Sequence, residues 1–355
     1  MKVLITGVCG FVGSAVATGI RKHIPECEIL GLDNLWRPGS ELNRARLREA
    51  GIRMVHADVR AASDFENLPK VDWVIDAAAN ASVLAGVDGA TSPKQLIEHN
   101  LVGTVNILEY CRRVGAGLVL LSTSRVYSIA ELNAIELKVT NNAFTPVPGK
   151  SLQGLTAAGI SESFSTAAPV SLYGSTKQAS ENLALEYAAS FGLPVWINRC
   201  GVMAGAGQFG QPAQGIFAWW INRWQKGKPL NYIGFGGLGH QVRDCLHPDD
   251  LISLLVKQLA KNPSEKIPAL VNLGGGMANS MSLAQLSEWC TQRFGSHKVG
   301  QDFKARPFDI PWVAMDSTLA ARTWDWKISR DMESILTEIA DHAESNPAWL
   351  DLSEG

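Results

Sequence analysis

The first thirteen residues combine a strand, a glycine turn and the start of a helix, and this combination narrows the possible folds most. Val3–Thr6 is a short apolar run, and Gly7, Gly10 and Gly13 follow as the helical pattern of Phe11–Arg21 begins. Gly7 permits a tight turn, Gly10 permits an anion to approach the backbone, and Gly13 permits the helix to pack closely on the sheet. The free N–H groups and the dipole of a helix N-terminus attract phosphate. The segment therefore predicts a pyrophosphate-binding loop of a dinucleotide site.

Short apolar strands alternate with helical stretches through the first half of the chain. The predicted strands are Val3–Thr6, Glu28–Leu32, Arg53–His56, Trp73–Asp76, Leu118–Leu121 and Pro194–Asn198. The predicted helices are Phe11–Arg21, Arg60–Leu68, Ser92–Cys111 and Ser175–Ser190. Several strands are apolar on both faces, as a buried parallel sheet requires. The alternation predicts an α/β fold with a Rossmann-type doubly wound parallel sheet.

The pattern changes at two places. Ser128–Ala168 is polar, punctuated by Gly and Pro, and longer than an ordinary connection, so we expect an insertion over the site. After Arg199 the chain becomes rich in Gly loops and Trp. Helices are predicted there at Gly215–Lys226, Pro248–Lys261, Ser282–Phe294 and Arg330–Glu344. We predict a dinucleotide-binding domain at residues 1–198, to which part of residues 232–273 returns, and a smaller C-terminal α/β substrate domain at residues 199–355 that covers a cleft.

The composition removes several classes of protein. The 355 residues carry 32 Lys and Arg against 34 Asp and Glu, a formal net charge of −2. Without a basic block, this balance argues against a nucleic-acid or anionic-membrane surface. No apolar run approaches the roughly 18 residues of a membrane span. The six Cys are scattered and the seven His lack metal spacing, so we expect a cytoplasmic protein with free thiols, no disulfide frame and no metal site.

An acidic residue stands where the second strand ends. Asp33 follows Gly13 by 20 residues, and a carboxylate there accepts hydrogen bonds from the adenosine ribose and repels a 2′-phosphate. This favours NAD over NADP. Arg37 is a complication, because a nearby Arg can hold a 2′-phosphate, and a turn residue is the structural alternative for Asp33. Asp58-Val59, at the end of the third strand, is placed to flank the adenine, with an ordinary strand-end Asp as the alternative.

Tyr173 and Lys177 lie four residues apart at the start of a helix, so their side chains share one face. A Lys ammonium near a Tyr hydroxyl lowers the pKa of that hydroxyl. The result is a general base that can take a proton from a sugar hydroxyl while the sugar carbon gives a hydride to NAD. A surface helix pair is the alternative. Hydroxyl groups at Ser122–Ser124 end the preceding strand, where side chains face the ligand crevice or cap the strand end.

These motifs are similar to those of the extended short-chain dehydrogenase/reductases that act on nucleotide sugars, over essentially the whole chain. The matching segments are Thr6-Gly7-x-x-Gly10-Phe11-Val12-Gly13, Asp33-Asn34, Asp58-Val59, Asn100-x-x-Gly103-Thr104-x-Asn106-x-Leu108-Glu109, Ser122-Thr123-x-x-Val126-Tyr127, Tyr173-x-x-x-Lys177 and Arg243-Asp244-x-x-His247-x-x-Asp250. The resemblance puts the catalytic Ser/Thr at Thr123, beside Tyr173 and Lys177. Nucleotide-sugar 4,6-dehydratases need an Asp-Glu pair directly after that Thr, and Ser124-Arg125 stand there instead.

Within this family the chain looks most like the CDP-tyvelose (CDP-paratose) 2-epimerases. The supporting segments include Gly159-Ile160-Ser161-Glu162, Gln208-Phe209, Gln214-Gly215 and Gln241-Val242-Arg243-Asp244-Cys245-Leu246-His247. The resemblance implies an NAD-dependent epimerase that oxidises a nucleotide-linked sugar to a keto sugar and returns the hydride to its other face. A nucleotide-sugar 4-epimerase or a net dehydrogenase or reductase is the first alternative. A non-catalytic NAD-binding regulator is the second, and the presence of all three catalytic residues argues against it.

The implied site has two parts, besides a catalytic set of Thr123, Tyr173 and Lys177. The predicted NAD contacts are Gly7, Gly10, Phe11, Val12, Gly13, Asp33, Asn34, Arg37, Asp58, Val59, Ala77, Ala78, Ala79, Asn100, Leu121, Tyr173, Lys177, Cys200 and Val202. The predicted substrate contacts are Ser124, Arg199, Gln208, Phe209, Arg243, Arg306 and Asp309. The arginines are candidates for the substrate pyrophosphate, with salt bridges as their structural alternative. We expect a CDP-sugar substrate and a homodimer or homotetramer.

Overall fold

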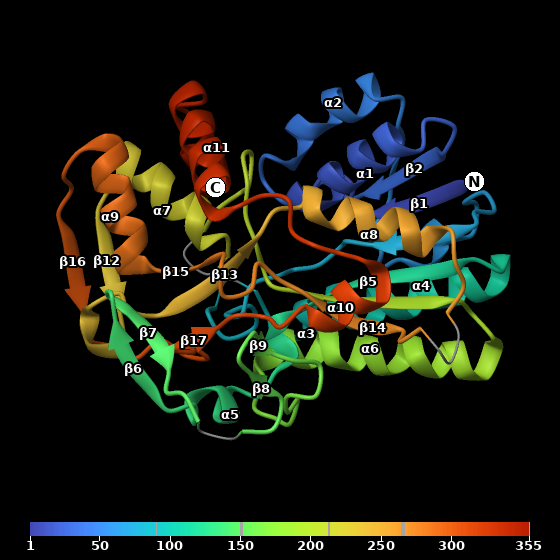
Figure 1. Cartoon of the computed structure of the whole chain (residues 1–355). Helices are drawn as coiled ribbons and strands as arrows, with labels where there is room; N and C mark the ends of the chain where they lie inside the picture. Colours follow the sequence, from blue (N-terminus) through green and yellow to red (C-terminus); the bar gives the residue numbers. More distant parts are fainter. Residues whose placement is uncertain (90, 150–151, 212–213, 264–266, 355) are drawn as a thin grey trace.

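A computed structural model describes residues 1–89, 91–149, 152–211, 214–263 and 267–354. Figure 1 shows two unequal parts side by side, a large parallel sheet with its helices and a smaller part that carries the C-terminal helices. No helix in these ranges is both long and apolar enough to cross a membrane.

The large part is built on a seven-stranded sheet. Its strands are β1 (Lys2–Thr6), β2 (Glu28–Asp33), β3 (Arg53–His56), β4 (Trp73–Asp76), β5 (Gly117–Thr123), β10 (Val195–Cys200) and β14 (Leu270–Leu273). Every pairing is parallel, in the order β14-β10-β5-β4-β1-β2-β3. The strand order reverses between β1 and β4, and in open α/β sheets ligands bind outside the carboxyl ends of the strands at such a point. The predicted doubly wound sheet is confirmed.

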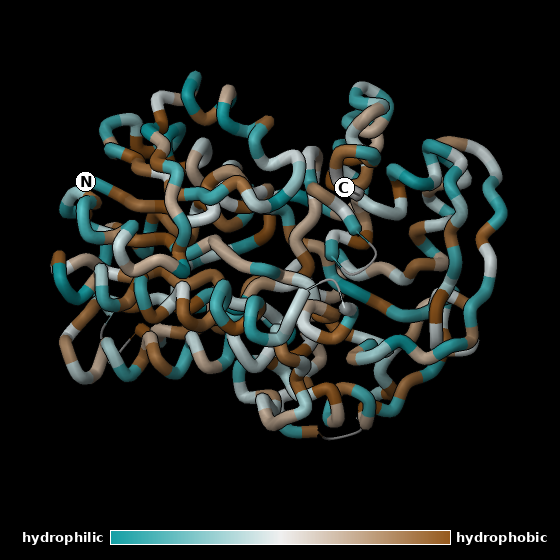
Figure 2. Tube along the Cα trace, turned by 180° about the vertical axis from the view of Figure 1, so that it is seen from behind, coloured by the Kyte–Doolittle hydropathy of each residue, from teal (hydrophilic) through white to brown (hydrophobic). Residues whose placement is uncertain are grey.

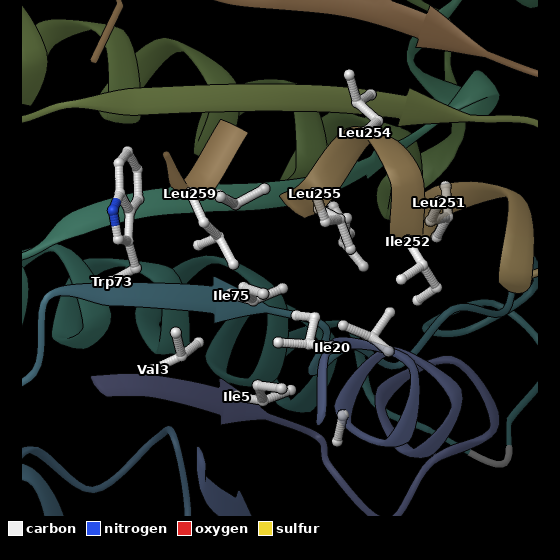
Figure 3. Close-up of a cluster of buried hydrophobic side chains, with 14 of the residues drawn as sticks. Val3, Ile5, Ile20, Trp73, Ile75, Leu251, Ile252, Leu254, Leu255 and Leu259 are labelled. Atoms are coloured by element: carbon white, nitrogen blue, oxygen red, sulfur yellow. The ribbon is translucent and has the colours of Figure 1, made fainter. Parts of the chain in front are cut away.

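Helices cover both faces of the sheet. On one face, β1 and β4 contact α1 (Phe11–His23) and α8 (Asp249–Leu259), together with Leu47 of α2 (Asn43–Glu49) and Trp324 of α10 (Thr318–Trp324). Figure 3 shows Ile5 and Ile75 of the sheet pointing toward Ile20 of α1 and the apolar residues of α8. The opposite face packs on α4 (Gly103–Val114) and α6 (Ser171–Phe191). Alternate residues of β1 thus enter two separate cores.

Several predicted helices differ from those in the structure. The helix predicted at Arg60–Leu68 is only a 3-10 turn, Ala62–Phe65. The helix predicted at Ser92–Cys111 forms as α3 (Pro93–Ile97), a π-helical segment at Glu98–Val102, and α4. The α6 helix begins at Ser171, before the predicted start, so Tyr173 lies inside its first turn.

The smaller part has its own mixed sheet and helices. Strand β13 (Val242–Leu246) pairs with β11 (Val202–Met203), β15 (Ser280–Ser282) and β17 (Trp312–Val313), and β12 (Leu230–Ile233) pairs with β16 (Val299–Asp302). The helices are α7 (Ile216–Gln225), α9 (Leu283–Phe294), α11 (Met332–Ser345) and α12 (Trp349–Glu354). Trp220, Ile335 and Leu336 are buried in a core that α7, α9 and α11 share. The capping box of Ser282 and Gln285 starts α9.

The chain crosses between the two parts more than once. Both α8 and β14, which fall within residues 248–273, return to the large sheet, and Ile252 of α8 lies where a side chain at Gly19 of α1 would be. Figure 2 shows hydrophobic segments along the interior strands and hydrophilic residues along the outer surface. The division into two domains at residue 198 stays a prediction.

The segment at residues 128–168 forms small elements below the two parts in Figure 1. They are α5 (Ile129–Asn133), the hairpin β6 (Leu137–Thr140) and β7 (Ala143–Pro146), and the pair β8 (Leu155–Thr156) and β9 (Gly159–Ile160). Its apolar side chains, including Leu132 and Phe164, pack with Val242 and Trp312 of the smaller part. The segment therefore braces the second sheet.

Candidate active site

A cleft of about 400 Å³ lies at the carboxyl ends of the central strands, between the two parts of the molecule. Its lining joins residues of β2, β5 and β10, and of the segments directly after β1 and β4, with residues from the smaller part. Most of the predicted site residues lie on it: Gly7, Gly10, Phe11, Val12, Gly13, Asp33, Asn34, Arg37, Val59, Ala77, Ala78, Ala79, Leu121, Thr123, Ser124, Tyr173, Cys200, Val202, Gln208, Phe209, Arg243, Arg306 and Asp309.

Four predicted residues do not line this cleft: Asp58, Asn100, Lys177 and Arg199. The insertion predicted to lie over the site does not line it either, since none of its described residues contributes to the wall. That expectation was wrong because the apolar side chains of the insertion are used against the second sheet.

The turn at Gly7, Gly10 and Gly13 leaves a space beside the backbone that a side chain at these positions would fill. Gly7 has φ +63°, and a Cβ there would lie 2.8 Å from the Cα of Ala78. A Cβ on Gly13 would lie 2.1 Å from the carbonyl oxygen of Gly7. Gly10 directly precedes the first residue of α1 and lines the cleft. The bare backbone at a helix N-terminus fits a dinucleotide pyrophosphate.

Asp33 braces this turn and also faces the cleft. Its carboxylate accepts hydrogen bonds from the N–H groups of Cys9 and Leu35, both at 2.8 Å. Burial raises the pKa of Asp33, and these two hydrogen bonds oppose the rise. A carboxylate has about four acceptor positions, so the side chain keeps capacity for ribose hydroxyls.

Asp58 and Asn100, two other predicted NAD contacts, do not line the cleft and hold the neighbouring segments in place. The carboxylate of Asp58 accepts hydrogen bonds from Arg60 at 2.6 Å and from Asn34 at 3.0 Å, and Arg60 holds the pKa of Asp58 well below its usual range. Asn100 exchanges hydrogen bonds with the backbone of Asn80 at 2.8 and 3.0 Å and donates to Thr176 at 3.2 Å. Asn100 therefore ties the strand-end segment after β4 to α6.

Tyr173 and Thr123 meet in the cleft. Burial raises the pKa of the Tyr173 phenol to about 12, and the neighbouring Thr123 side chain opposes that rise. Lys177 lies one turn later on α6, and its side chain is buried. Its charge opposes the burial that raises the pKa of the Cys200 thiol to about 12, which places the ammonium near the cleft wall. Tyr173 and Thr123 thus line the cleft, with Lys177 buried behind its wall near Cys200.

Arg37 joins the two parts of the molecule. Its guanidinium donates hydrogen bonds to the Phe209 carbonyl at 2.5 Å and to the side-chain oxygen of Gln214 at 3.0 Å. The ring of Phe209 stacks on Trp349, with 5.1 Å between ring centroids, and Trp349 donates to the Gln208 carbonyl at 3.0 Å. Both terminal nitrogens of Arg37 therefore bind protein groups, which disfavours a role in holding a 2′-phosphate.

The predicted substrate cations separate into two groups. Arg243 lines the cleft and pairs with Asp309 at 2.9 Å, close to Arg306. Arg199 lies outside the cleft wall and is buried, with its guanidinium paired to the buried carboxylate of Glu181 at 2.7 Å. Arg199 is therefore corrected from a substrate contact to a structural ion pair, because its charge is already satisfied.

Other residues at the cleft escaped sequence reasoning. Arg125 lines the cleft directly after the hydroxyl residues that end β5. In the sequence it was marked only by the absence of the Asp-Glu pair that a 4,6-dehydratase has after its Thr. Trp36 and His99 form a ring pair at 5.3 Å between centroids, near Val59. They come from segments far apart in sequence, so no local pattern marks them.

Burial raises the pKa of both the Cys9 and the Cys200 thiol to about 12, so both thiols remain neutral.

Within the described ranges no group of three or more His, Cys, Asp or Glu side chains is arranged to hold a metal ion. The residues Thr123 and Tyr173 share one cleft with a glycine loop at a helix N-terminus and a strand-end carboxylate. The fold and the site together define an α/β dinucleotide-dependent enzyme.

Comparison with known proteins gives the family. The family model described as "NAD dependent epimerase/dehydratase family" matches residues 3–274. The chain is 32% identical to a CDP-paratose 2-epimerase of Salmonella typhi, over 81% of this chain and 82% of that protein. It is 26% identical to a UDP-glucuronate 4-epimerase of Thermodesulfobacterium geofontis (strain OPF15), over 97% of this chain and 96% of that protein.

A solved structure shows the same fold. The UDP-glucuronic acid 4-epimerase of Bacillus cereus, in complex with UDP-glucuronic acid and NAD, superposes with a TM-score of 0.76 at 22% identity, covering 97% of this chain and 99% of that chain. The protein belongs to the NAD-dependent epimerase/dehydratase family, whose nucleotide-sugar enzymes use NAD.

Proposed function

We propose that the protein is an NAD-dependent 2-epimerase of a nucleotide-linked sugar of the CDP-paratose/CDP-tyvelose type. The observation that carries the proposal is that Thr123 and Tyr173 line one cleft together with Arg243 and Asp309. Thr123 also lowers the pKa of the Tyr173 phenol. The similarity to a CDP-paratose 2-epimerase supports the choice of substrate. The Ser124-Arg125 sequence supports an epimerase over a 4,6-dehydratase, because no carboxylate follows Thr123 to assist elimination of water.

The cofactor site fits NAD. The glycine loop would hold its pyrophosphate, and Asp33 would accept hydrogen bonds from its ribose hydroxyls. When bound, NAD supplies the acceptor for a hydride from the sugar and the donor that returns it.

The protein's side chains handle the proton and the oxygen. Tyr173, ionised with the help of Lys177, takes the proton from the C2 hydroxyl, and Thr123 donates a hydrogen bond at the same oxygen. The 2-keto sugar then turns in the cleft and presents its other face. Tyr173 returns the proton to the oxygen, so the reaction leaves no net change of oxidation state.

The substrate diphosphate needs cations in the cleft. Arg243 and Arg306 are the proposed partners, because a guanidinium matches the geometry of phosphate oxygens. Asp309 holds Arg243 by an ion pair at 2.9 Å and sets its orientation. Gln208 and Phe209 line the wall from the smaller part and are placed to contact the sugar or the base.

A 4-epimerase is the second candidate function. The similarity to a UDP-glucuronate 4-epimerase over almost the whole of both chains favours it. The same Tyr173 and Thr123 would act on a C4 hydroxyl if the sugar were bound in another orientation.

A substrate panel tests the proposal. The enzyme with NAD is incubated separately with CDP-paratose, CDP-glucose and UDP-glucuronate, and the products are identified by NMR. We expect inversion at C2 of CDP-paratose and no change in UDP-glucuronate. Inversion at C4 of UDP-glucuronate, with CDP-paratose unchanged, would replace the proposal with the second candidate. The cytoplasmic location and the homodimer or homotetramer both stay predictions.

A further inference from the structure

The sugar end of the cleft carries an excess of positive charge. Among the described residues of its wall, Arg125, Arg243 and Arg306 come together with one carboxylate, Asp309. Arg243 is already fixed by Asp309 at 2.9 Å and by the Val242 carbonyl at 2.8 Å. Arg125 differs from the other two arginines because it belongs to the same turn as the catalytic hydroxyl.

Two contacts fix Arg125 beside the catalytic pair. Its backbone N–H donates to the hydroxyl of Thr123 at 3.2 Å. Its carbonyl oxygen would lie 2.3 Å from a Cβ at position 174, so only the glycine that follows Tyr173 allows this turn to sit on α6. The backbone of Arg125 thus rests on both Thr123 and Gly174. Its side chain enters the same cleft as the hydroxyl of Tyr173.

We propose that Arg125 is a positioning residue whose guanidinium, together with Lys177, stabilises the ionised hydroxyl of Tyr173. The proposal rests on the proposed function only in taking Tyr173 as the base. Arg125 stands at a position where a 4,6-dehydratase would need an acid. A cation at this position favours the phenolate of Tyr173, and it cannot donate a proton to a leaving hydroxyl at neutral pH.

The charges around Tyr173 are consistent with this task. Burial raises the pKa of Tyr173, the Cys200 thiol adds to the rise, and Thr123 and the charge of Arg125 oppose it. Burial and repulsion from Arg243 and Arg306 lower the pKa of Arg125 to about 10, and Asp309 and Tyr173 oppose that change. The guanidinium of Arg125 therefore stays charged through neutral pH.

Ultraviolet difference titration of the NAD-loaded enzyme tests the proposal. The chain has only five Tyr, and subtraction of a Tyr173→Phe variant isolates the ionisation of Tyr173. We expect Arg125→Met and Arg125→Gln to move this ionisation upward by about one pH unit, the size of shift that one nearby charge produces. Arg125→Lys should restore most of the change, because it keeps the charge.

Arg243→Met is the matched control, since it removes from the same cleft a positive charge that Asp309 already pairs with at 2.9 Å. It should leave the ionisation of Tyr173 in place. An unchanged titration in both neutral Arg125 variants, or an equal shift in Arg243→Met, would overturn the proposal. Because the titration needs neither turnover nor the correct sugar, its result is independent of the substrate panel. Thermal unfolding of Arg125→Lys and Arg125→Gln verifies that the compared variants are folded.

Discussion

Gly10 and Gly13 lie in the same turn, but a side chain at each of the two positions would meet different surroundings. A Cβ on Gly13 would meet the Gly7 carbonyl oxygen at 2.1 Å, whereas a Cβ on Gly10 would meet it at 3.1 Å. We therefore expect Gly13→Ala to lower the free energy of unfolding by about 3 kcal/mol, as overpacking does. Gly10→Ala should cost less than about 1 kcal/mol yet abolish NAD binding, because its methyl group faces the cleft. Denaturant unfolding and calorimetric titration with NAD measure both; wild-type NAD affinity in Gly10→Ala would contradict the assigned pyrophosphate site.

Arg199 and Glu181 form a buried ion pair next to β5, the strand that ends at Thr123. Their side chains are 9% and 2% exposed and 2.7 Å apart, so removing one partner leaves an unpaired buried charge. We expect Arg199→Met to reduce the free energy of unfolding by about 3–5 kcal/mol. The double variant Glu181→Gln with Arg199→Met should regain part of that loss. If Arg199→Met were as stable as the wild type and had lost substrate affinity, the original assignment to the substrate site would be right.

At the residue scale, sequence reasoning succeeded where chemistry is local in the chain. The glycine turn, Asp33, and the one-turn spacing of Tyr173 and Lys177 each occupy a short segment with its own physical reason. Arg199 could not be assigned in this way, because its partner Glu181 comes from another element and a sequence does not show which charges are paired.

At the level of elements, Arg37 connects the end of β2 to the loop around Phe209. Its two hydrogen bonds, at 2.5 and 3.0 Å, hold that loop against the NAD half of the cleft. We expect Arg37→Met to speed NAD dissociation by roughly tenfold, since hydrogen bonds to charged groups contribute about 1.5–3 kcal/mol. The preference for NAD over NADP should not change. Stopped-flow fluorescence measures the release, and a large change in the NAD to NADP preference would mean that Arg37 contacts the cofactor instead.

Helix α11 is tied to the cleft loops through Glu338. Its carboxylate accepts a hydrogen bond from the Ala206 N–H at 3.1 Å, contacts His247 at 3.3 Å and pairs with Arg330. Hydrogen bonding to His247 lowers the pKa of Glu338 from 4.5 to about 2. Because the folded-state pKa is depressed, this stability is fully present above about pH 4.5 and is lost as the pH falls toward 2.

The expected loss in that window is roughly 1–2 kcal/mol after allowance for partial exposure. Glu338→Gln should be less stable than the wild type at pH 7, with the difference shrinking toward pH 2. Urea unfolding at a series of pH values measures it. A difference that stays constant from pH 7 to pH 2 would exclude Glu338 as the titrating group.

The elements of the sheet were predictable because each buried strand is a short apolar run between turn signals. The insertion at residues 128–168 was placed wrongly over the site. Its contacts with Val242 and Trp312 depend on the second sheet, whose strands are only two to five residues long and show little periodicity. The division of the helix before α4 by a π-helical segment also depends on tertiary contacts with α6.

For the whole molecule, three apolar side chains on neighbouring elements of the large part are exposed. Ile97 and Val102, on α3 and the π-helical segment, and Leu185, on α6, are exposed although these elements pack together. Apolar groups gathered on neighbouring helices favour association of two copies. The homodimer or homotetramer stays a prediction.

The central claim is that the enzyme removes and returns the same hydride at C2 of the sugar. The most direct measurement is a reaction of CDP-paratose in deuterated water, followed by NMR at C2 and by absorbance of reduced cofactor. We predict inversion at C2 with no deuterium at that carbon and no accumulation of NADH, because the hydride does not exchange with solvent. Deuterium at C2 would show enolisation, and stoichiometric NADH would show a net dehydrogenase; either result would contradict the account.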